Sequence, residues 1–194
     1  MISLHNQHFS SLNEDQILAY ERIVEDVNKE TCTMFFVDGY GGTDKTFMWN
    51  VLSYRFRSEG LIVLNVASSG IATLLLLGGR TTHSKFGIPM TLTEVSFCRM
   101  KKNNHKAQLL RRASLIIWDE TPMINRFAIE AFDRSLRDII KLTSEGEHAS
   151  HLVERQLFLG VIFVRYYRLF LEALVRILLT QVSIQCFYGQ IVKC

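Results

Sequence analysis

The sequence predicts an α/β fold, because three short apolar runs typical of buried strands alternate with segments of helical periodicity. These runs are 34–37, 61–67 and 114–118, and each stops at carboxylate, glycine or serine residues. With 194 residues, of which 48% are hydrophobic and 21% charged, the chain can form one domain with a substantial core.

The bulk composition excludes few functions. A formal net charge of +3 is too small to indicate nucleic-acid binding by itself. The four cysteines show neither C-x-x-C spacing nor a dense framework, which favours reduced thiols in an intracellular protein. The N-terminus lacks the basic start and sustained apolar core of a signal peptide.

The first predicted helix begins after Asn13. Asn13 can cap it, and Gln16 stands at the third helical position, as in a capping box. Apolar residues then recur at helical spacing from Ile17 to Val27.

The strand at 34–37 leads into a glycine-rich turn, then Lys45-Thr46, then a helix through Phe47 and Trp49. This order is the layout of a phosphate-binding P-loop, in which backbone N–H groups point at phosphate oxygens. Lys45 would reach the β- and γ-phosphates, and the Thr46 hydroxyl would hold Mg²⁺. The alternative is an ordinary strand–turn–helix with a chance Lys-Thr pair.

The P-loop pattern departs from its usual form at one position. Gly39 fills the first glycine position of G-x-x-x-x-G-K-[ST], but Asp44 occupies the second. Glycine there lets the backbone approach the phosphates, whereas a carboxylate about 4 Å from a phosphate repels it by ~1 kcal/mol in water and ~4 kcal/mol at an intermediate dielectric. We therefore expect weakened nucleotide binding.

The strand at 61–67 is followed by Ser68, Ser69 and Gly70, then by a helix over 71–77 and a loop over 81–84 that contains His83. Small hydroxyl residues and a histidine after a strand suit contacts with a nucleic-acid backbone, but they are also common turn and capping residues. The basic stretch at 99–112 could likewise line a phosphate backbone or form a solvated helix face.

The strand at 114–118 ends in Asp119 and Glu120, and a core helix is expected over 127–140. Behind a P-loop, such a pair indicates a second nucleotide-binding motif: Asp119 would hold the Mg²⁺ shell, and Glu120 would position and deprotonate the attacking water. We expect this pair and Lys45 to lie at neighbouring strand ends of a parallel sheet.

Several segments in order resemble the superfamily-1B, 5′-to-3′ DNA helicases of the "petite integration frequency" type, especially forms carried by Helitron-like transposons. They are L-N-E-D-Q, F-F-V-D-G-Y-G-G-T-D-K-T-F, L-I-V-L-N-V-A-S-S-G-I-A, G-G-R-T-T-H-S-K-F-G-I-P, and L-I-I-W-D-E-T-P-M followed by A-F-D-R-S-L-R-D-I. The resemblance implies a RecA-like P-loop NTPase domain with a central parallel sheet over residues 11–140, preceded by a tail at 1–10.

The resemblance also implies roles for individual residues. Gln16 would read adenine, a role that competes with capping. The ATP loop would comprise Gly39, Tyr40, Gly41, Gly42, Thr43, Asp44, Lys45 and Thr46, although the family usually has proline at Tyr40 and glycine at Asp44. Lys45 and Glu120 would be catalytic, Thr46 and Asp119 would hold Mg²⁺, and Ser68, Ser69, Gly70 and His83 would lie on the DNA side.

The implied function is ATP hydrolysis coupled to unwinding, with single-stranded or forked DNA as partner and an intracellular, nuclear location. The family serves telomere maintenance, repair, recombination and transposition. One alternative is a relic without catalysis that at most binds nucleotide or single-stranded DNA, and another is a different P-loop ATPase or a small kinase. The T-T-H-S and L-I-I-W-D-E-T-P-M runs argue against the last of these.

The resemblance stops after Ile140, where a third motif, G-D-F-R-Q, and a second lobe are expected. The segment 141–194 diverges from the family. However, a nucleotide sequence can be written that encodes residues 161–171 and that gives G-D-F-R-Q-I-L-P-V-I-P when it is read one base earlier, from the last base of the Gly160 codon. We therefore hypothesise a frameshift between about Lys141 and Ser150. The chain would then be a truncated motor-lobe fragment, weak or inactive alone, with a non-native tail whose charges argue against a membrane span.

Overall fold

The computed structural model describes residues 2–29, 34–38, 44–100, 104–141, 160–164 and 189–193. Its elements follow one another as α1 (Ile2–Phe9), α2 (Glu14–Asn28), β1 (Met34–Asp38), α3 (Lys45–Ser58), β2 (Ile62–Ala67), α4 (Gly70–Leu75), β3 (Arg80–Thr81), α5 (Thr82–Phe86), α6 (His105–Arg112), β4 (Ala113–Asp119), the 3₁₀ turn η1 (Thr121–Met123), α7 (Arg126–Lys141), β5 (Gly160–Val164) and β6 (Gly189–Lys193).

All six strands form one parallel sheet in the order β3-β2-β4-β5-β1-β6, which confirms the predicted α/β class. β1 and β4 are separated by β5, so the expectation that Lys45 and the carboxylate pair follow neighbouring strands is wrong in this detail. β5 pairs with both, through Val37↔Val164 on one side and Trp118↔Phe163 on the other. The two motifs still lie at the same edge, because the strands are parallel.

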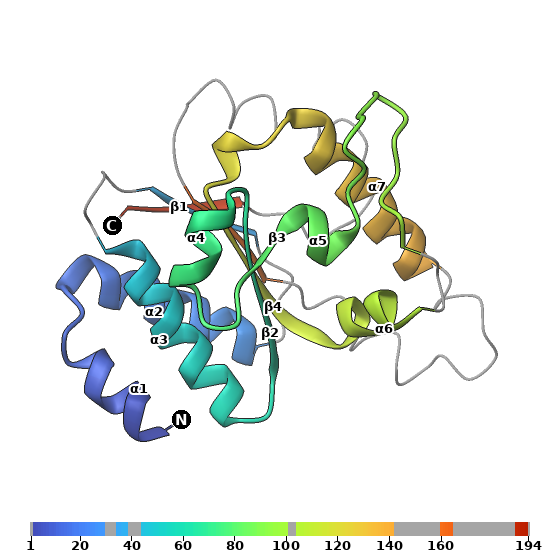
Figure 1. Cartoon of the computed structure of the whole chain (residues 1–194). Coiled ribbons are helices and arrows are strands. Elements are labelled where there is room, and N and C mark those ends of the chain that lie inside the picture. Colours follow the sequence, from blue (N-terminus) through green and yellow to red (C-terminus); the bar gives the residue numbers. More distant parts are fainter. Residues whose placement is uncertain are drawn as a thin grey trace, which may run out of the picture.

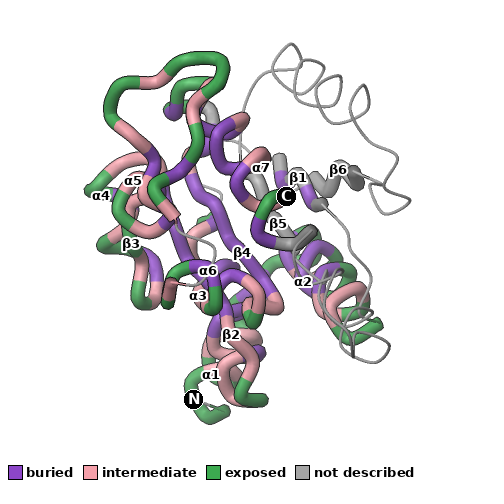
Figure 2. The backbone as a smooth tube through the Cα atoms, turned by 90° about the vertical axis from the view of Figure 1, so that its right-hand side faces the viewer, coloured by how far each residue is buried: buried purple, intermediate pink, exposed green. Residues whose placement is uncertain are grey.

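Helices cover both faces of the sheet (Figure 1). Side chains of successive strand residues point to opposite faces. Accordingly, Leu115 and Ile117 pack with α2 and α3, whereas Ile116 and Trp118 pack with α5, α6 and α7. The strand β4 is buried over most of its length (Figure 2), which explains its near-continuous apolar sequence.

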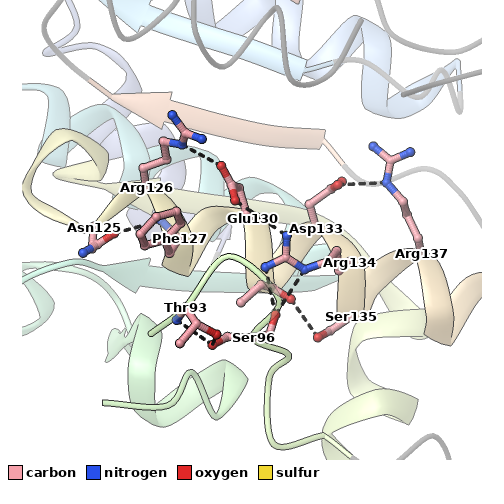
Figure 3. A network of polar contacts seen from close by, with 11 residues as sticks. Thr93, Ser96, Asn125, Arg126, Phe127, Glu130, Asp133, Arg134, Ser135 and Arg137 are labelled. Carbon is pink, nitrogen blue, oxygen red and sulfur yellow. Dashed lines mark hydrogen bonds and ion pairs between the residues drawn. The ribbon is translucent and has the colours of Figure 1, made fainter. Parts of the chain in front are cut away.

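The connection between α5 and α6 is tied to α7 (Figure 3). The Arg134 guanidinium donates two hydrogen bonds, of 3.1 and 2.9 Å, to the carbonyl oxygen of Ser96. The Ser135 hydroxyl accepts a 2.8 Å bond from the backbone N–H of Cys98. The last bond satisfies the backbone N–H of the buried Cys98, and the two from Arg134 fix the half-buried Ser96 to α7.

The predicted N-terminal tail at 1–10 contains a helix. Residues 2–9 form α1, and the His8 ring stacks on Tyr54 of α3 with 5.6 Å between ring centroids. The imidazole of His5 hydrogen-bonds the Tyr20 hydroxyl at 2.8 Å. Burial raises the pKa of Tyr20 to about 12. The predicted boundary at residue 10 therefore separates two helices that pack on the same lobe.

Two segments from the region predicted to be out of frame lie in the sheet. β5 pairs with β4 and β1, and β6 pairs with β1. The sheet thus extends past the predicted lobe boundary at residue 140. The frameshift itself stays a prediction, and its expected position between Lys141 and Ser150 falls mostly outside the described residues.

The segment predicted to be a loop at 81–84 instead contains the end of β3 at Thr81 and the start of α5 at Thr82. Thr81 caps this helix by accepting a hydrogen bond from the Ser84 N–H. The prediction was wrong because hydroxyl residues, which favour turns, are equally good helix caps. Within the described residues, none of the helices combines the length and apolarity that crossing a bilayer requires.

Candidate functional site: the carboxyl ends of β2 and β4

Two carboxylates stand where β4 ends. Asp119 is the last strand residue and is only 8% exposed, whereas Glu120 is half-buried and has a left-handed backbone, with φ 53° and ψ 37°. The Glu120 N–H donates a 3.0 Å hydrogen bond to Oδ1 of Asp119. A non-glycine residue in this conformation is uncommon, and such positions cluster at functional sites.

The first turn of α3 meets this pair, although it lies far away in the sequence. Thr46 donates a hydrogen bond to the Asp119 carboxylate, and the Lys45 ammonium is close enough to act on its charge. Lys45 itself is buried. The structure thus brings together three of the residues that the two motifs predicted.

Burial is the main influence on Asp119 and raises the pKa of its carboxyl group. The Glu120 N–H, the Lys45 charge and the Thr46 hydroxyl oppose this rise, while the Glu120 carboxylate adds to it. A buried carboxylate and a threonine hydroxyl are oxygen ligands, which Mg²⁺ prefers, and Mg²⁺ in phosphate sites takes few protein ligands besides the phosphates. The donor set therefore fits a Mg²⁺–phosphate group.

The two serines that follow β2 supply a second set of contacts to the pair. The Ser69 hydroxyl donates a 2.6 Å hydrogen bond to Oε2 of Glu120 and also caps α4 by accepting from the Ala72 N–H. The Ser68 N–H donates to the carbonyl oxygen of Asp119 at 3.1 Å, and its hydroxyl accepts from the Trp118 indole at 3.2 Å. The serines predicted to face DNA therefore contact the predicted metal and water residues directly.

The sequence did not reveal this contact. β2 and β4 pair in register through Ala67↔Asp119, so the residues that follow each strand are neighbours. The only signal was that both strands end in polar residues, and it becomes informative once the two strands are known to pair. Gly70, the third predicted residue here, is exposed and begins α4.

Asp44 has the backbone conformation that its position requires of glycine. It precedes α3 with φ 47° and ψ 34°, it is exposed, and its side chain makes no capping hydrogen bond. This left-handed conformation favours glycine, which explains why the P-loop pattern has glycine there. The preceding loop residues Gly39, Tyr40, Gly41, Gly42 and Thr43 lie outside the described residues.

Gln16 forms the predicted capping box. Its Oε1 accepts a 3.1 Å hydrogen bond from the Asn13 N–H, and its own N–H donates to Asn13 Oδ1 at 2.8 Å. Only 3% of the residue is exposed. The capping role is confirmed, and adenine reading stays a prediction.

His83 follows the edge strand β3, whose Thr81 pairs with Ala67 of β2, and no contact joins it to the carboxylate pair within the described residues. It belongs to α5, whose Phe86 packs on the face of the sheet opposite to α3. The basic stretch contributes α6, where Lys106 and Arg112 are exposed, as the solvated-face interpretation expects. Lys101 and Lys102 lie outside the described residues.

Known proteins are similar to this chain in sequence and in fold. A family model described as PIF1-like helicase matches residues 11–163. The ATP-dependent DNA helicases PIF4 and PIF1 of Trypanosoma brucei brucei are 30% and 34% identical over 106 and 105 residues. These segments make up 53% and 54% of this chain but only 13% and 10% of those relatives.

Solved structures agree in fold. The Bacteroides Pif1 helicase in complex with ADP-AlF3 and ssDNA superposes with a TM-score of 0.59 at 21% identity, over 94% of this chain and 42% of that one. The Candida albicans Pif1 helicase gives 0.52 at 15% identity, over 94% and 40% of the two chains. Since the family model matches residues 11–163, which is more than half of the sequence, the chain belongs to the PIF1-like helicase family.

Proposed function

We propose that this chain binds Mg-ATP and forms part of the motor of a 5′-to-3′ DNA helicase. The observation that supports this best is the convergence of Lys45 and Thr46, at the start of α3, on Asp119 at the end of β4. A lysine, a hydroxyl and a carboxylate at this edge of a parallel sheet are the groups that a metal-bound triphosphate requires.

Each residue has a role in this proposal. Lys45 binds the β- and γ-phosphates, Thr46 and Asp119 hold Mg²⁺, and Glu120 positions and deprotonates water. Adenine reading by Gln16 and phosphate binding by 39–44 complete the nucleotide site. Single-stranded or forked DNA is the partner, contacted by 68–70 and His83. The Bacteroides relative with ADP-AlF3 and ssDNA supports both ligands.

An intracellular, nuclear location belongs to the same proposal, as does a part in DNA repair, recombination, telomere maintenance or transposition. The free thiol of Cys98, which is buried, is compatible with a reducing compartment.

Nucleotide binding and turnover test the proposal. Mg-ATP binding by the full chain is expected to fall at least tenfold in Lys45→Ala and to be unchanged in Lys29→Ala, an exposed lysine that pairs with Glu25. Glu120→Gln should keep binding but abolish any turnover that single-stranded DNA stimulates. Binding that is insensitive to Lys45→Ala would contradict the proposal.

A relic without catalysis remains the second candidate, and the exposed Asp44 carboxylate at the N-terminus of α3 favours it. It predicts weak nucleotide binding with no turnover, with or without DNA. DNA-stimulated turnover that requires Glu120 would exclude it.

A further inference from the structure

A hollow of about 220 Å³ lies on the face of the sheet opposite to α3, beside the edge strand β3. Buried apolar side chains of β2, α5 and α6 line it, among them Leu64, Phe86 and Leu110. Its polar lining is dominated by three cations, Arg80, Lys85 and Lys106, and none of the described residues that line it is acidic.

These cations have no counter-charge among the described residues. Arg80 is exposed and Lys85 is half-buried, and neither side chain makes a hydrogen bond or ion pair within the described part of the chain. Lys106 donates a 2.7 Å hydrogen bond from Nζ to the Ser84 carbonyl, which fixes its ammonium beside α5. Arg57 donates to the Val63 carbonyl at 3.0 Å and adds a fourth positive charge nearby.

The charged groups around Lys85 are all positive among the described residues. Burial lowers the pKa of Lys85, and the charges of Arg80, Arg57 and Lys106 lower it further. Holding like charges around a half-buried ammonium destabilises the folded state unless an anion compensates them. Acidic side chains such as Glu59 and Asp133 are paired with other cations.

We propose that this hollow binds a phosphate group. Lysine and arginine at converging positions are the usual ligands of phosphate oxygens. The volume lies below the roughly 300–1,000 Å³ of pockets that enclose drug-sized ligands, which favours one phosphate over a whole nucleotide. The phosphate can come from a small free anion or from a DNA backbone, since the chemistry is the same.

The test compares two double variants of the full chain in a Lys45→Ala background, which removes phosphate binding at the predicted ATP loop. Arg80→Gln with Lys85→Gln changes the hollow. Arg55→Gln with Lys29→Gln is the matched control, because it removes the same charge from ion-paired helix surfaces on the other face. The probes are inorganic pyrophosphate and a short DNA hairpin with a single-stranded arm.

The hollow variant is expected to bind pyrophosphate, DNA or both about tenfold more weakly than the control variant. Pyrophosphate should also shift the amide resonances of Ser84 and Lys85. For DNA, the slope of log affinity against log salt should fall by roughly 1–2. Weakening with pyrophosphate alone identifies a small anion as the ligand, and weakening that includes DNA identifies the backbone.

Equal affinity of the two double variants for both probes would overturn the proposal. Unfolding of the hollow variant is not expected to affect this comparison, because replacing an uncompensated cation such as Lys85 should not destabilise the folded protein. Urea unfolding of each variant without anion checks this point. Because the Lys45→Ala background is common to both, failure here is distinct from failure of the proposed ATP site.

Discussion

Replacing Asp44 with glycine is expected to tighten nucleotide binding by about fivefold. The residue sits at the N-terminus of α3, where a triphosphate would bind, and its side chain makes no capping hydrogen bond that the change would remove. Because Asp44 is exposed, its repulsion of a phosphate about 4 Å away lies near the aqueous limit of ~1 kcal/mol. That free energy corresponds to about fivefold in Kd.

Two further variants separate the charge from the backbone. Asp44→Asn removes the charge but keeps a residue that tolerates the left-handed conformation observed at φ 47°. Asp44→Ala also removes the charge but is expected to cost about 1 kcal/mol of folding stability there. Asp44→Gly removes the strain of the left-handed backbone, but the greater entropy of the unfolded chain lowers stability by about 0.5–1 kcal/mol, so the net effect on stability should be small.

Isothermal titration with Mg-ADP and urea unfolding measure the two effects separately. All three variants should bind more tightly than the parent protein, while only Asp44→Ala should be clearly less stable. If Asp44→Asn binds no more tightly, the charge argument is wrong. If only Asp44→Gly gains affinity, steric access of the backbone to phosphate is the cause.

Ser69→Ala should lower the free energy of unfolding by about 1–2 kcal/mol in urea, because the variant loses the α4 cap and the bond to Glu120, whereas Ser69→Thr should retain most of the stability. Gln16→Glu can still complete the capping box, but it buries a carboxylate at a position that is 3% exposed, so it should lower the free energy of unfolding by about 1–3 kcal/mol. A selective loss of ATP over GTP binding in this variant would reveal adenine reading. Asp119→Asn should raise the free energy of unfolding at neutral pH, measured in urea without Mg²⁺. Because the pKa of Asp119 is raised in the folded state, its ionised form destabilises the folded protein. This destabilisation is complete above the folded-state pKa and vanishes below the unfolded-state pKa. The wild type should therefore converge with this variant as the pH falls, and parallel profiles would refute the assignment.

The local elements of this fold could be predicted from sequence because their signals are local. The capping box at Asn13 and Gln16 is fixed by two residues three positions apart. The strands β2 and β4 were recognisable because both faces are buried, which requires a continuous apolar run. The departure of Asp44 from the P-loop pattern was visible for the same reason, whereas its left-handed backbone was seen only in the structure.

The order of strands could not be predicted, because it depends on pairing between segments far apart in the chain. Nothing in β1 or β4 alone indicates that β5 lies between them. The contact between Ser69 and Glu120 has the same origin: each residue belongs to a separate motif, and only the β2–β4 pairing brings them together. The helix α5 was missed for a different reason, namely that Thr81 fits a turn and a helix cap equally well.

The β2–β4 pairing also bears on how a nucleotide and DNA would influence one another. Ser68 and Ser69 hold Asp119 and Glu120 by direct hydrogen bonds, so a DNA phosphate that takes the Ser69 hydroxyl must compete with the Glu120 carboxylate. Hydrogen bonds to charged groups contribute about 1.5–3 kcal/mol, enough to change an equilibrium tenfold or more. Linkage requires the effect to be reciprocal, so a nucleotide that draws Glu120 away would free Ser69 for DNA by the same factor.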